Sequence, residues 1–299
     1  MKFMNTPEER FKNLKDYNFK PNFIELKEGL KMHYVDEGSK DATQTVLLLH
    51  GEPSWSYLYR KMIPIFAKAG HRVIAPDLIG FGKSSKPVDF ETYSYQNHTK
   101  WTSEILTQLN LNNITLFCQD WGGLIGMRLA AQHLEKFSKV AIANTAFPMG
   151  VKDVSKLAVF LQWQQYAKKI DKMNVGKVIQ NSTVNELTDE EIAAYWAPFP
   201  DIEFMAGAKI FPSLVPLEME DAECVTNRRI WQEKWLTWEK PFLTLFSDKD
   251  PMFSGKEVYY QKNIPGAKGQ PHKVIKDGGH FLQEDKGEEI ANVLVEWMG

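Results

Sequence analysis

Apolar and polar positions along the chain follow two periods, one typical of strands and one typical of helices. Residues 22–28 and 31–36 alternate apolar and polar side chains on either side of Gly29, which predicts a β-hairpin. Residues 45–50 are almost wholly apolar, as in a strand that is buried on both faces of a sheet. Further elements are predicted as helices over 56–68, 94–110 and 122–133 and as strands over 71–76, 114–119 and 139–145.

This alternation of strands and helices is interrupted in the middle of the chain. Residues 149–216 contain helical patterns, turns and several prolines, but no run typical of a buried strand. The elements predicted after them are a helix over 218–236, strands over 242–246 and 273–276, and a last helix over about 286–298. We therefore predict an α/β fold, with a mostly parallel central sheet flanked by helices. Its core comprises 1–148 and 217–299, and 149–216 form an inserted helical cap over the carboxyl edge of the sheet, where open α/β sheets bind ligands.

Composition and charge exclude several classes of function. The 299 residues have a formal net charge of −2, so no basic excess exists to neutralise the phosphates of a nucleic acid. The two cysteines, Cys118 and Cys224, suit neither a disulfide framework nor a zinc site, and we expect no metal or other cofactor. No stretch approaches the roughly 20 apolar residues of a membrane span, and the first residues show no secretory signal. We expect a cytoplasmic monomer without a membrane partner.

The residues around Asp120 give the strongest indication of chemistry. A predicted strand ends at Gln119, Asp120 follows, and Gly122 and Gly123 open a helical run. This is the layout of a nucleophile elbow, a tight strand-to-helix turn that exposes one side chain at the carboxyl edge of a sheet. The usual residue there is serine, whereas a carboxylate needs no base to displace a leaving group from saturated carbon. The pattern alone also allows a structural role, because Asp is a favoured N-cap of a helix.

A covalent ester on Asp120 would need a general base for its hydrolysis and an acid that orients the base. His280 lies in a Gly-Gly-His-Phe sequence after the last predicted strand, where glycines permit a close approach to neighbouring strand ends. Two acids, Asp248 and Asp250, follow the preceding strand. We favour Asp250, because Pro251 fixes a turn after it. The resulting chain order of nucleophile, acid and histidine is that of the α/β-hydrolase fold.

The same intermediate needs an oxyanion hole made of two backbone N–H groups. Trp121, directly after the candidate nucleophile, supplies one. The loop after the apolar strand over 45–50 supplies the other through Glu52, because Pro53 has no N–H to donate. The Glu52 carboxylate must then find a partner elsewhere.

Four motifs together resemble those of haloalkane dehalogenases in the α/β-hydrolase superfamily, and the resemblance covers nearly the whole chain. The motifs are HGEPSWSYLYR at 50–60, APDLIGFGKS at 75–84, QDWGG at 119–123 and GGHF at 278–281. The first is the most specific to dehalogenases, and the second is shared by many α/β-hydrolases. The resemblance implies that Asp120 attacks the carbon bearing the halogen, His280 activates water and Asp250 orients it. Some members place this acid after the strand that follows the elbow helix, but residues 143–145 contain none.

The resemblance also implies how the departing halide is held, since the family uses two side-chain N–H donors. One is the indole of Trp121, and the other is that of Trp163 in the cap, with Trp196 as the alternative. An indole N–H only donates hydrogen bonds, which suits a halide. The residues that would line the substrate pocket are Phe160, Phe211 and Pro212. The expected partners are a small haloalkane and a halide ion.

Two other functions stay open at this point. An epoxide hydrolase shares the fold, the aspartate nucleophile and the His–Asp pair, but protonates its substrate with two cap tyrosines, for which Tyr166 and Tyr195 are candidates. A catalytically silent member would bind a ligand without turnover, and the intact set of Asp120, Asp250 and His280 argues against it. An esterase is disfavoured, because the elbow lacks serine.

Overall fold

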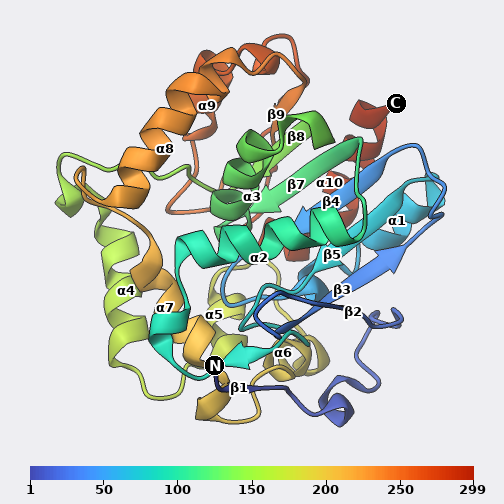
Figure 1. The fold of residues 1–299 in the computed structure, drawn as a ribbon, viewed down its shortest axis with the longest axis vertical. Coiled ribbons are helices and arrows are strands. Elements are labelled where there is room, and N and C mark those ends of the chain that lie inside the picture. Colours follow the sequence, from blue (N-terminus) through green and yellow to red (C-terminus); the bar gives the residue numbers. More distant parts are fainter.

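A central sheet positions the candidate residues at the ends of its strands. A computed structural model describes the whole chain, residues 1–299. The strands of the sheet are β2 Asn22–Glu25, β3 Lys31–Glu37, β4 Thr45–Leu49, β5 Arg72–Pro76, β7 Ile114–Gln119, β8 Phe137–Ala143 and β9 Phe242–Thr244. Their order across the sheet is β2-β3-β5-β4-β7-β8-β9 (Figure 1). The pairs β2–β3 and β3–β5 are antiparallel and the other four are parallel, which confirms the mostly parallel sheet. A separate two-stranded sheet pairs β1 Phe3–Met4 with β6 Lys86–Pro87.

Helices cover both faces of this sheet. They are α1 Ile63–Lys68, α2 Tyr95–Gln108, α3 Trp121–Gln132, α8 Ala222–Glu233, α9 Glu257–Asn263 and α10 Leu282–Met298. Strand β4 shows how the sequence produces two cores, because its side chains alternate between them. Val46 and Leu48 join the cluster that includes residues of α1 and α10, and Leu47 and Leu49 join the cluster that includes residues of α2, α3 and α8. Figure 1 shows α2 and α3 lying in front of the sheet.

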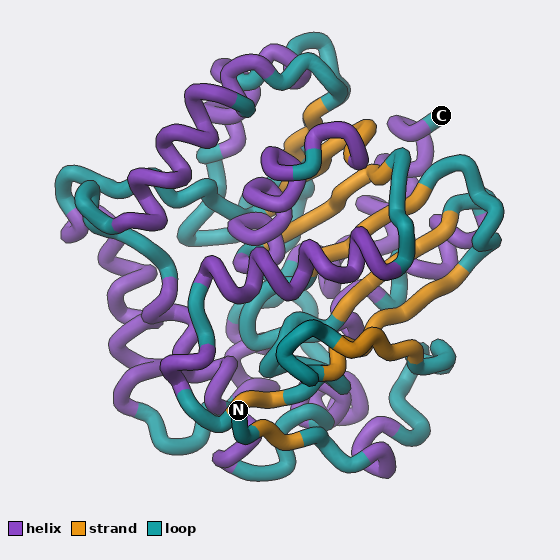
Figure 2. Tube along the Cα trace, viewed as in Figure 1, coloured by secondary structure: helices purple, strands orange, loops and turns teal.

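The segment between β8 and α8 is helical and contains no strand. Its helices are α4 Ala158–Lys169, α5 Val175–Asn181, α6 Asp189–Trp196 and α7 Ala206–Leu214. They gather at one end of the molecule, below the sheet in Figure 1, and the tube view shows them joined by irregular connections (Figure 2). Helix α4 packs against α7, and α5 packs against α6. The break in strand–helix alternation predicted from the sequence is therefore present.

Some predicted elements differ from those observed. The hairpin turning at Gly29, which has a φ of 80°, is confirmed. The helix predicted over 56–68 is instead a 3₁₀ turn over Ser56–Tyr59 followed by the short α1, which starts with Pro64 in its first turn. The helix predicted over 218–236 is shorter, and α9 was not predicted.

The prediction of a regular strand over 273–276 is wrong. One bridge, between Ser247 and Ile275, is formed, and the backbone N–H of Lys273 donates to the carbonyl of Thr244 at 3.2 Å, but no continuous ladder results. The backbone N–H of Thr244 donates to the imidazole Nδ1 of His272 at 3.1 Å rather than to a carbonyl of a neighbouring strand. A side chain thus takes the place of a ladder bond at the edge of the sheet.

Two further features bear on function. No helix is both long and apolar enough to cross a membrane. No group of three or more His, Cys, Asp or Glu side chains is arranged so that it could hold a metal ion.

Candidate active site

Asp120 lies in a tight turn between β7 and α3. Its backbone φ of 52° is in the left-handed region, where residues with a Cβ are strained and where functional side chains are often held. The turn fits only because Gly122 follows, since a Cβ there would lie 2.0 Å from the carbonyl oxygen of Leu49. Asp120 occupies the N-cap position of α3, but its side chain makes no capping hydrogen bond. The carboxylate is therefore free of the structural role that the sequence left open.

The carboxylate of Asp120 faces an imidazole that a second acid orients. His280 Nε2 lies 3.5 Å from Asp120 Oδ2, and His280 Nδ1 lies 2.7 Å from Asp250 Oδ2. The other oxygen of Asp250 accepts hydrogen bonds from the backbone N–H groups of Met252 and Phe253, at 2.8 and 3.2 Å. Three side chains from three separate loops thus form one chain of contacts, in the order that the sequence predicts.

Asp248, the competing acid, points elsewhere. Its carboxylate accepts a hydrogen bond from the backbone N–H of Asp277 and lies 3.6 Å from the ammonium of Lys276. The structure therefore brings Asp250, and not Asp248, to His280.

The charges of this group act on the protonation of the histidine. Burial lowers the pKa of His280, but the carboxylates of Asp250 and Asp120 outweigh burial and raise the pKa to about 10. Burial raises the pKa of Asp250, but the neighbouring imidazole outweighs this and lowers it. In the free protein the imidazole is hence protonated at neutral pH and lies between two carboxylates.

The residues expected to form an oxyanion hole lie beside Asp120. The backbone N–H of Glu52 donates to Asp120 Oδ1 at 2.8 Å. Trp121 is the first residue of α3, so its backbone N–H has no acceptor within the helix. Burial and the adjacent Asp120 charge raise the pKa of Glu52 well above its ordinary value, and Glu52 Oε1 has no hydrogen-bond partner. Burial thus disfavours the charged form of this carboxyl group.

Two amides that sequence reasoning missed hold the His280 loop in place. Gln119 donates from its side-chain nitrogen to the carbonyl of His280 at 3.0 Å, and the same nitrogen lies 3.0 Å from His280 Nε2. Asn144, at the end of β8, donates to the carbonyls of Gly279 and His280 at 3.0 and 3.1 Å. Gln119 directly precedes Asp120, the candidate nucleophile. This position is the one sequence feature that could have identified Gln119 as part of the site.

A cavity of about 860 Å³ opens in front of Asp120. Its wall is mostly apolar and includes residues of the loop after β8, of α4 and α5, and of the loops before α9 and α10. The predicted site residues that line it are Glu52, Asp120, Trp121, Phe160, Trp163, Pro212 and His280. Cavities of this size and polarity are typical of small-molecule sites.

Three of the aromatic side chains considered from the sequence do not line the cavity. Phe211, expected in the pocket wall, is fully buried behind Trp121, with 4.6 Å between the ring centroids. The indole of Trp196, the alternative halide donor, packs beside Gly176 within the helical segment. Tyr195 is fully buried and donates its hydroxyl hydrogen bond to Glu284 at 2.6 Å.

Known proteins share this fold and its sequence over almost the full length. Residues 44–287 match the family of the alpha/beta hydrolase fold. A curated haloalkane dehalogenase of Psychrobacter cryohalolentis is 52% identical over all of this chain and 98% of its own length. The chain belongs to the haloalkane dehalogenase family. A second haloalkane dehalogenase, of Mycolicibacterium paratuberculosis, is 42% identical over 99% of the chain and 98% of its own length. Among solved structures, the haloalkane dehalogenase DpaA of Paraglaciecola agarilytica, described as tetrameric, superposes with a TM-score of 0.88 at 35% identity and covers 98% of the chain and 97% of its own length.

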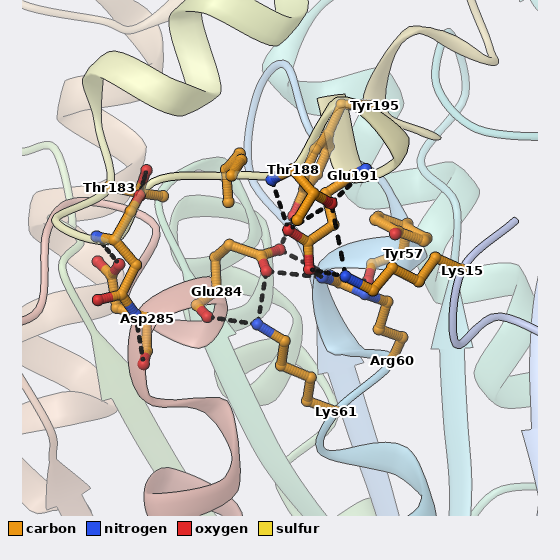
Figure 3. Close-up of polar contacts among 12 residues, drawn as sticks. Lys15, Tyr57, Arg60, Lys61, Thr183, Thr188, Glu191, Tyr195, Glu284 and Asp285 are labelled. Atoms are coloured by element: carbon orange, nitrogen blue, oxygen red, sulfur yellow. Dashed lines mark hydrogen bonds and ion pairs between the residues drawn. The ribbon is translucent and has the colours of Figure 1, made fainter. Parts of the chain in front are cut away.

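A buried ionic network joins the helical segment to the core of this member of the haloalkane dehalogenase family (Figure 3). Arg60 lies at its centre and donates to both carboxylate oxygens of Glu284, at the start of α10, at 2.6 and 2.7 Å. It also donates to Glu191 of α6 at 2.9 Å. Lys61 donates to the Glu284 carboxylate at 2.7 Å. Burial raises the pKa of Glu284, but Arg60 and Lys61 outweigh burial and lower it to about 2.

A second set of contacts links the helical segment to the loop that contains His280. The Asp285 carboxylate accepts hydrogen bonds from the backbone N–H groups of Val184 and Asn185, and at 2.8 Å from that of Gly279. The backbone N–H of Phe281 donates to the carbonyl of Ser182 at 3.1 Å. Phe281 is therefore held directly by the segment that leads from α5 to α6, and Gly279 is connected to that segment through the Asp285 carboxylate.

Proposed function

We propose that this chain hydrolyses the carbon–halogen bond of haloalkanes to an alcohol, a halide ion and a proton, through a covalent alkyl ester on Asp120. One observation carries the proposal. The carboxylate of Asp120 does not cap its helix, faces a mostly apolar cavity, and lies 3.5 Å from an imidazole that Asp250 orients. Membership in the haloalkane dehalogenase family supports the same reaction.

In the first step, an oxygen of Asp120 attacks the carbon that bears the halogen from the side opposite the leaving group. The carbon–oxygen bond forms as the carbon–halogen bond breaks, and the bonding pair leaves with the halide. We propose that the indole N–H groups of Trp121 and Trp163, which both line the cavity, stabilise the halide as its charge develops.

In the second step, His280 takes a proton from a water molecule that attacks the carbonyl carbon of the ester. Esterification neutralises Asp120, one of the two charges that raise the pKa of His280, so that pKa falls and the imidazolium releases its proton to solvent. This is the proton of the overall reaction, and the neutral imidazole that remains can then accept the proton of water. The backbone N–H groups of Glu52 and Trp121 stabilise the oxyanion, and Asp250 stabilises the imidazolium. Collapse of the intermediate releases the alcohol and restores the carboxylate.

Residues 149–216 would serve as the cap of this site, on a core formed by 1–148 and 217–299. Support comes from the cavity wall, which takes residues from α4 and α5 as well as from the strand ends. A cap of this kind excludes water from the first step, which strengthens every electrostatic interaction inside.

The epoxide hydrolase alternative receives less support. It requires two tyrosine hydroxyls directed at the substrate, and only Tyr166 lines the cavity. Tyr195 is fully buried and its hydroxyl is bound to Glu284. A silent binding protein would have no need of the complete set of Asp120, Asp250 and His280.

Halide release from 1-bromobutane and 1-bromohexane, with 1,2-epoxyhexane as the rival substrate, tests the proposal. We expect bromide and the matching alcohol in equal amounts, and no diol from the epoxide. Asp120→Asn should abolish release, and mass spectrometry would reveal any amide that hydrolyses back to the carboxylate. Sustained bromide release by a variant that shows no such reversion would refute the role of Asp120.

The oligomeric state of the chain and its location in the cell stay predictions. The chain is expected to be a monomer in the cytoplasm, whereas its structural relative DpaA is described as tetrameric. Light scattering coupled to size exclusion at micromolar concentration distinguishes a mass near 34.4 kDa from a multiple of it.

A further inference from the structure

The cavity is much larger than a small haloalkane requires. Its volume of about 860 Å³ is near the upper end of the range for drug-sized ligands, which is about 300–1,000 Å³. The reacting carboxylate and the Trp pair occupy only one part of its wall. A substrate that filled the space would therefore extend from Asp120 along the apolar side chains toward solvent.

The charged side chains that line this cavity are separated by sign. Both acids, Glu52 and Asp120, are part of the reacting group described above. The other charged residues of the wall, apart from His280, are all lysines, and all are exposed. They are Lys156, Lys177, Lys249 and Lys256. This is a local excess of cations in a chain whose Lys and Arg number 36 against 38 Asp and Glu.

The lysines come from four separate segments, line the cavity and are exposed, so they do not form one face of a single helix. Lys156 lies in the 3₁₀ turn over Val154–Leu157, Lys177 in α5, Lys249 in the loop after β9, and Lys256 at the start of α9. We call these four residues the lysine rim.

Most of this charge is not neutralised by the protein. Lys156, Lys177 and Lys256 form no ion pair, and the nearest oxygen of an acid to Lys249 is Asp248 Oδ2 at 3.9 Å. Lys256 lies over the ring of Phe253, 5.2 Å from its centroid, and that ring stacks on His280 at 5.8 Å. One cation of the rim is therefore connected to the reacting group through a single aromatic side chain.

We propose that the substrates of this enzyme carry an anionic group, a carboxylate or sulfonate, at the end remote from the halogen, and that the lysine rim binds it. The halogen end would lie at Asp120, the alkyl stem against the apolar wall, and the anion among the ammonium groups at the opening. The inference rests on the proposed dehalogenase activity and specifies its substrate class. The rim contributes to capture and orientation and takes no part in bond breaking.

A series of bromoalkanes that differ in terminal charge tests the proposal. The probes are 8-bromooctanoate, 8-bromooctan-1-ol and (8-bromooctyl)trimethylammonium, with halide release measured and enzyme-free release subtracted. We expect kcat/KM to be highest for the anion, intermediate for the alcohol and lowest for the cation, with the anion favoured over the alcohol about tenfold at low ionic strength. The preference should appear in KM. It should vanish in about 1 M of a halide-free salt, where the Debye length is about 3 Å.

Matched variants assign the preference to the rim. Lys156→Gln/Lys177→Gln removes two rim charges, and Lys152→Gln/Lys169→Gln removes two charges from exposed lysines of the same part of the chain that do not line the cavity. The rim variant should lose most of the anion-to-alcohol ratio of kcat/KM, whereas the control should keep it. Equal thermal unfolding temperatures of the two variants exclude a folding defect.

The outcomes separate this inference from the proposed function. Bromide release from the alcohol with no preference for the anion would overturn the lysine rim and leave the dehalogenase in place. An anion preference that the control variant loses as fully as the rim variant would also overturn it, since general charge would then be the cause. No bromide from any probe would refute the proposed function itself.

Discussion

At the scale of single residues, the site depends on a few side chains whose positions are fixed by the local backbone conformation and by hydrogen bonds. Asp120 is held with a φ of 52°, and Gly122 is needed because any Cβ would meet the Leu49 carbonyl. His280 is fixed through both ring nitrogens and through its own carbonyl. A substitution of the Asp120 or His280 side chain should therefore change one step of the reaction rather than the fold, whereas any side chain at position 122 would disturb the turn itself.

His280→Gln is expected to separate the two steps. The Asp120 carboxylate needs no base to attack carbon, so the alkyl ester should form, but its hydrolysis should slow at least about 100-fold without the general base. Intact-protein mass spectrometry after addition of 1-bromohexane should show one hexyl adduct on the protein. Fragmentation that places the adduct anywhere other than Asp120, or a protein without adduct, would contradict the two-step scheme.

Trp163→Phe is expected to weaken halide binding, with Trp196→Phe as its control. Hydrogen bonds to charged groups contribute about 1.5–3 kcal/mol, so loss of one indole N–H should raise the Kd for bromide about 10- to 100-fold. Trp196 does not line the cavity, and its substitution should leave that Kd unchanged. Quenching of the remaining tryptophan fluorescence by bromide measures both. The assignment fails if the two variants behave alike or if Trp196→Phe has the larger effect.

At the scale of elements, the helical segment is attached to the core by buried charge. Arg60, fully buried, joins Glu284 of α10 to Glu191 of α6. The pairing spans 224 residues between Arg60 and Glu284, and neither residue belongs to a recognisable pairing pattern in the sequence. Because Arg60 contacts both Glu191 of α6 and Glu284 of α10 (Figure 3), loss of the contact should change how the helical segment packs on the core as well as stability.

Glu284→Gln is expected to lower stability at pH 7 by about 3–5 kcal/mol, because it leaves Arg60 buried without its main partner. The pKa of Glu284 is lowered to about 2, below its ordinary 4.5, so its stabilisation is complete above pH 4.5 and is lost as the pH falls toward 2. The gap in unfolding free energy between wild type and variant should therefore shrink between pH 4.5 and pH 2. Urea unfolding across this range measures it.

Glu288→Gln is the matched control on the same helix, since Glu288 is exposed and forms no ion pair. It should change the unfolding free energy by less than about 0.5 kcal/mol. A gap for Glu284→Gln that is as small as this, or that is independent of pH, would show that the network does not stabilise the fold.

The elements predicted from the sequence were those with strong hydrophobic patterns. Strands buried on both faces, such as 45–50, and the helix after Asp120 have continuous apolar runs, and the structure contains them. The segment 273–276 was predicted as a strand too, but it forms a single bridge, and just before it the imidazole of His272 accepts the Thr244 N–H in place of a backbone carbonyl. The hydrophobic periodicity of a segment does not reveal such a contact, because the contact joins a side chain to the backbone of a different segment.

At the scale of the whole molecule, the sequence was sufficient for the fold and for the three residues that meet at the strand ends. Asp120, Asp250 and His280 each follow a predicted strand, and parallel strands end at a common edge of the sheet. The prediction that Phe211 lines the pocket was wrong. Its neighbour Pro212 lines the cavity, but the sequence does not indicate whether the adjacent ring points into the cavity or, as observed, packs against Trp121 outside it. Gln119 and Asn144 were missed, since a side-chain amide that supports a loop has no spacing of its own.

One measurement tests the central claim, that Asp120 forms a covalent ester, more directly than any substitution. A single turnover with enzyme in excess over 1-bromohexane is carried out in H₂¹⁸O, and the peptide containing Asp120 and the hexanol are both analysed by mass spectrometry. Because water attacks the carbonyl carbon of the ester, the account predicts ¹⁸O in the Asp120 carboxyl group and unlabelled hexanol. Labelled hexanol with an unlabelled peptide would show that water displaces the halide directly, and would contradict the account.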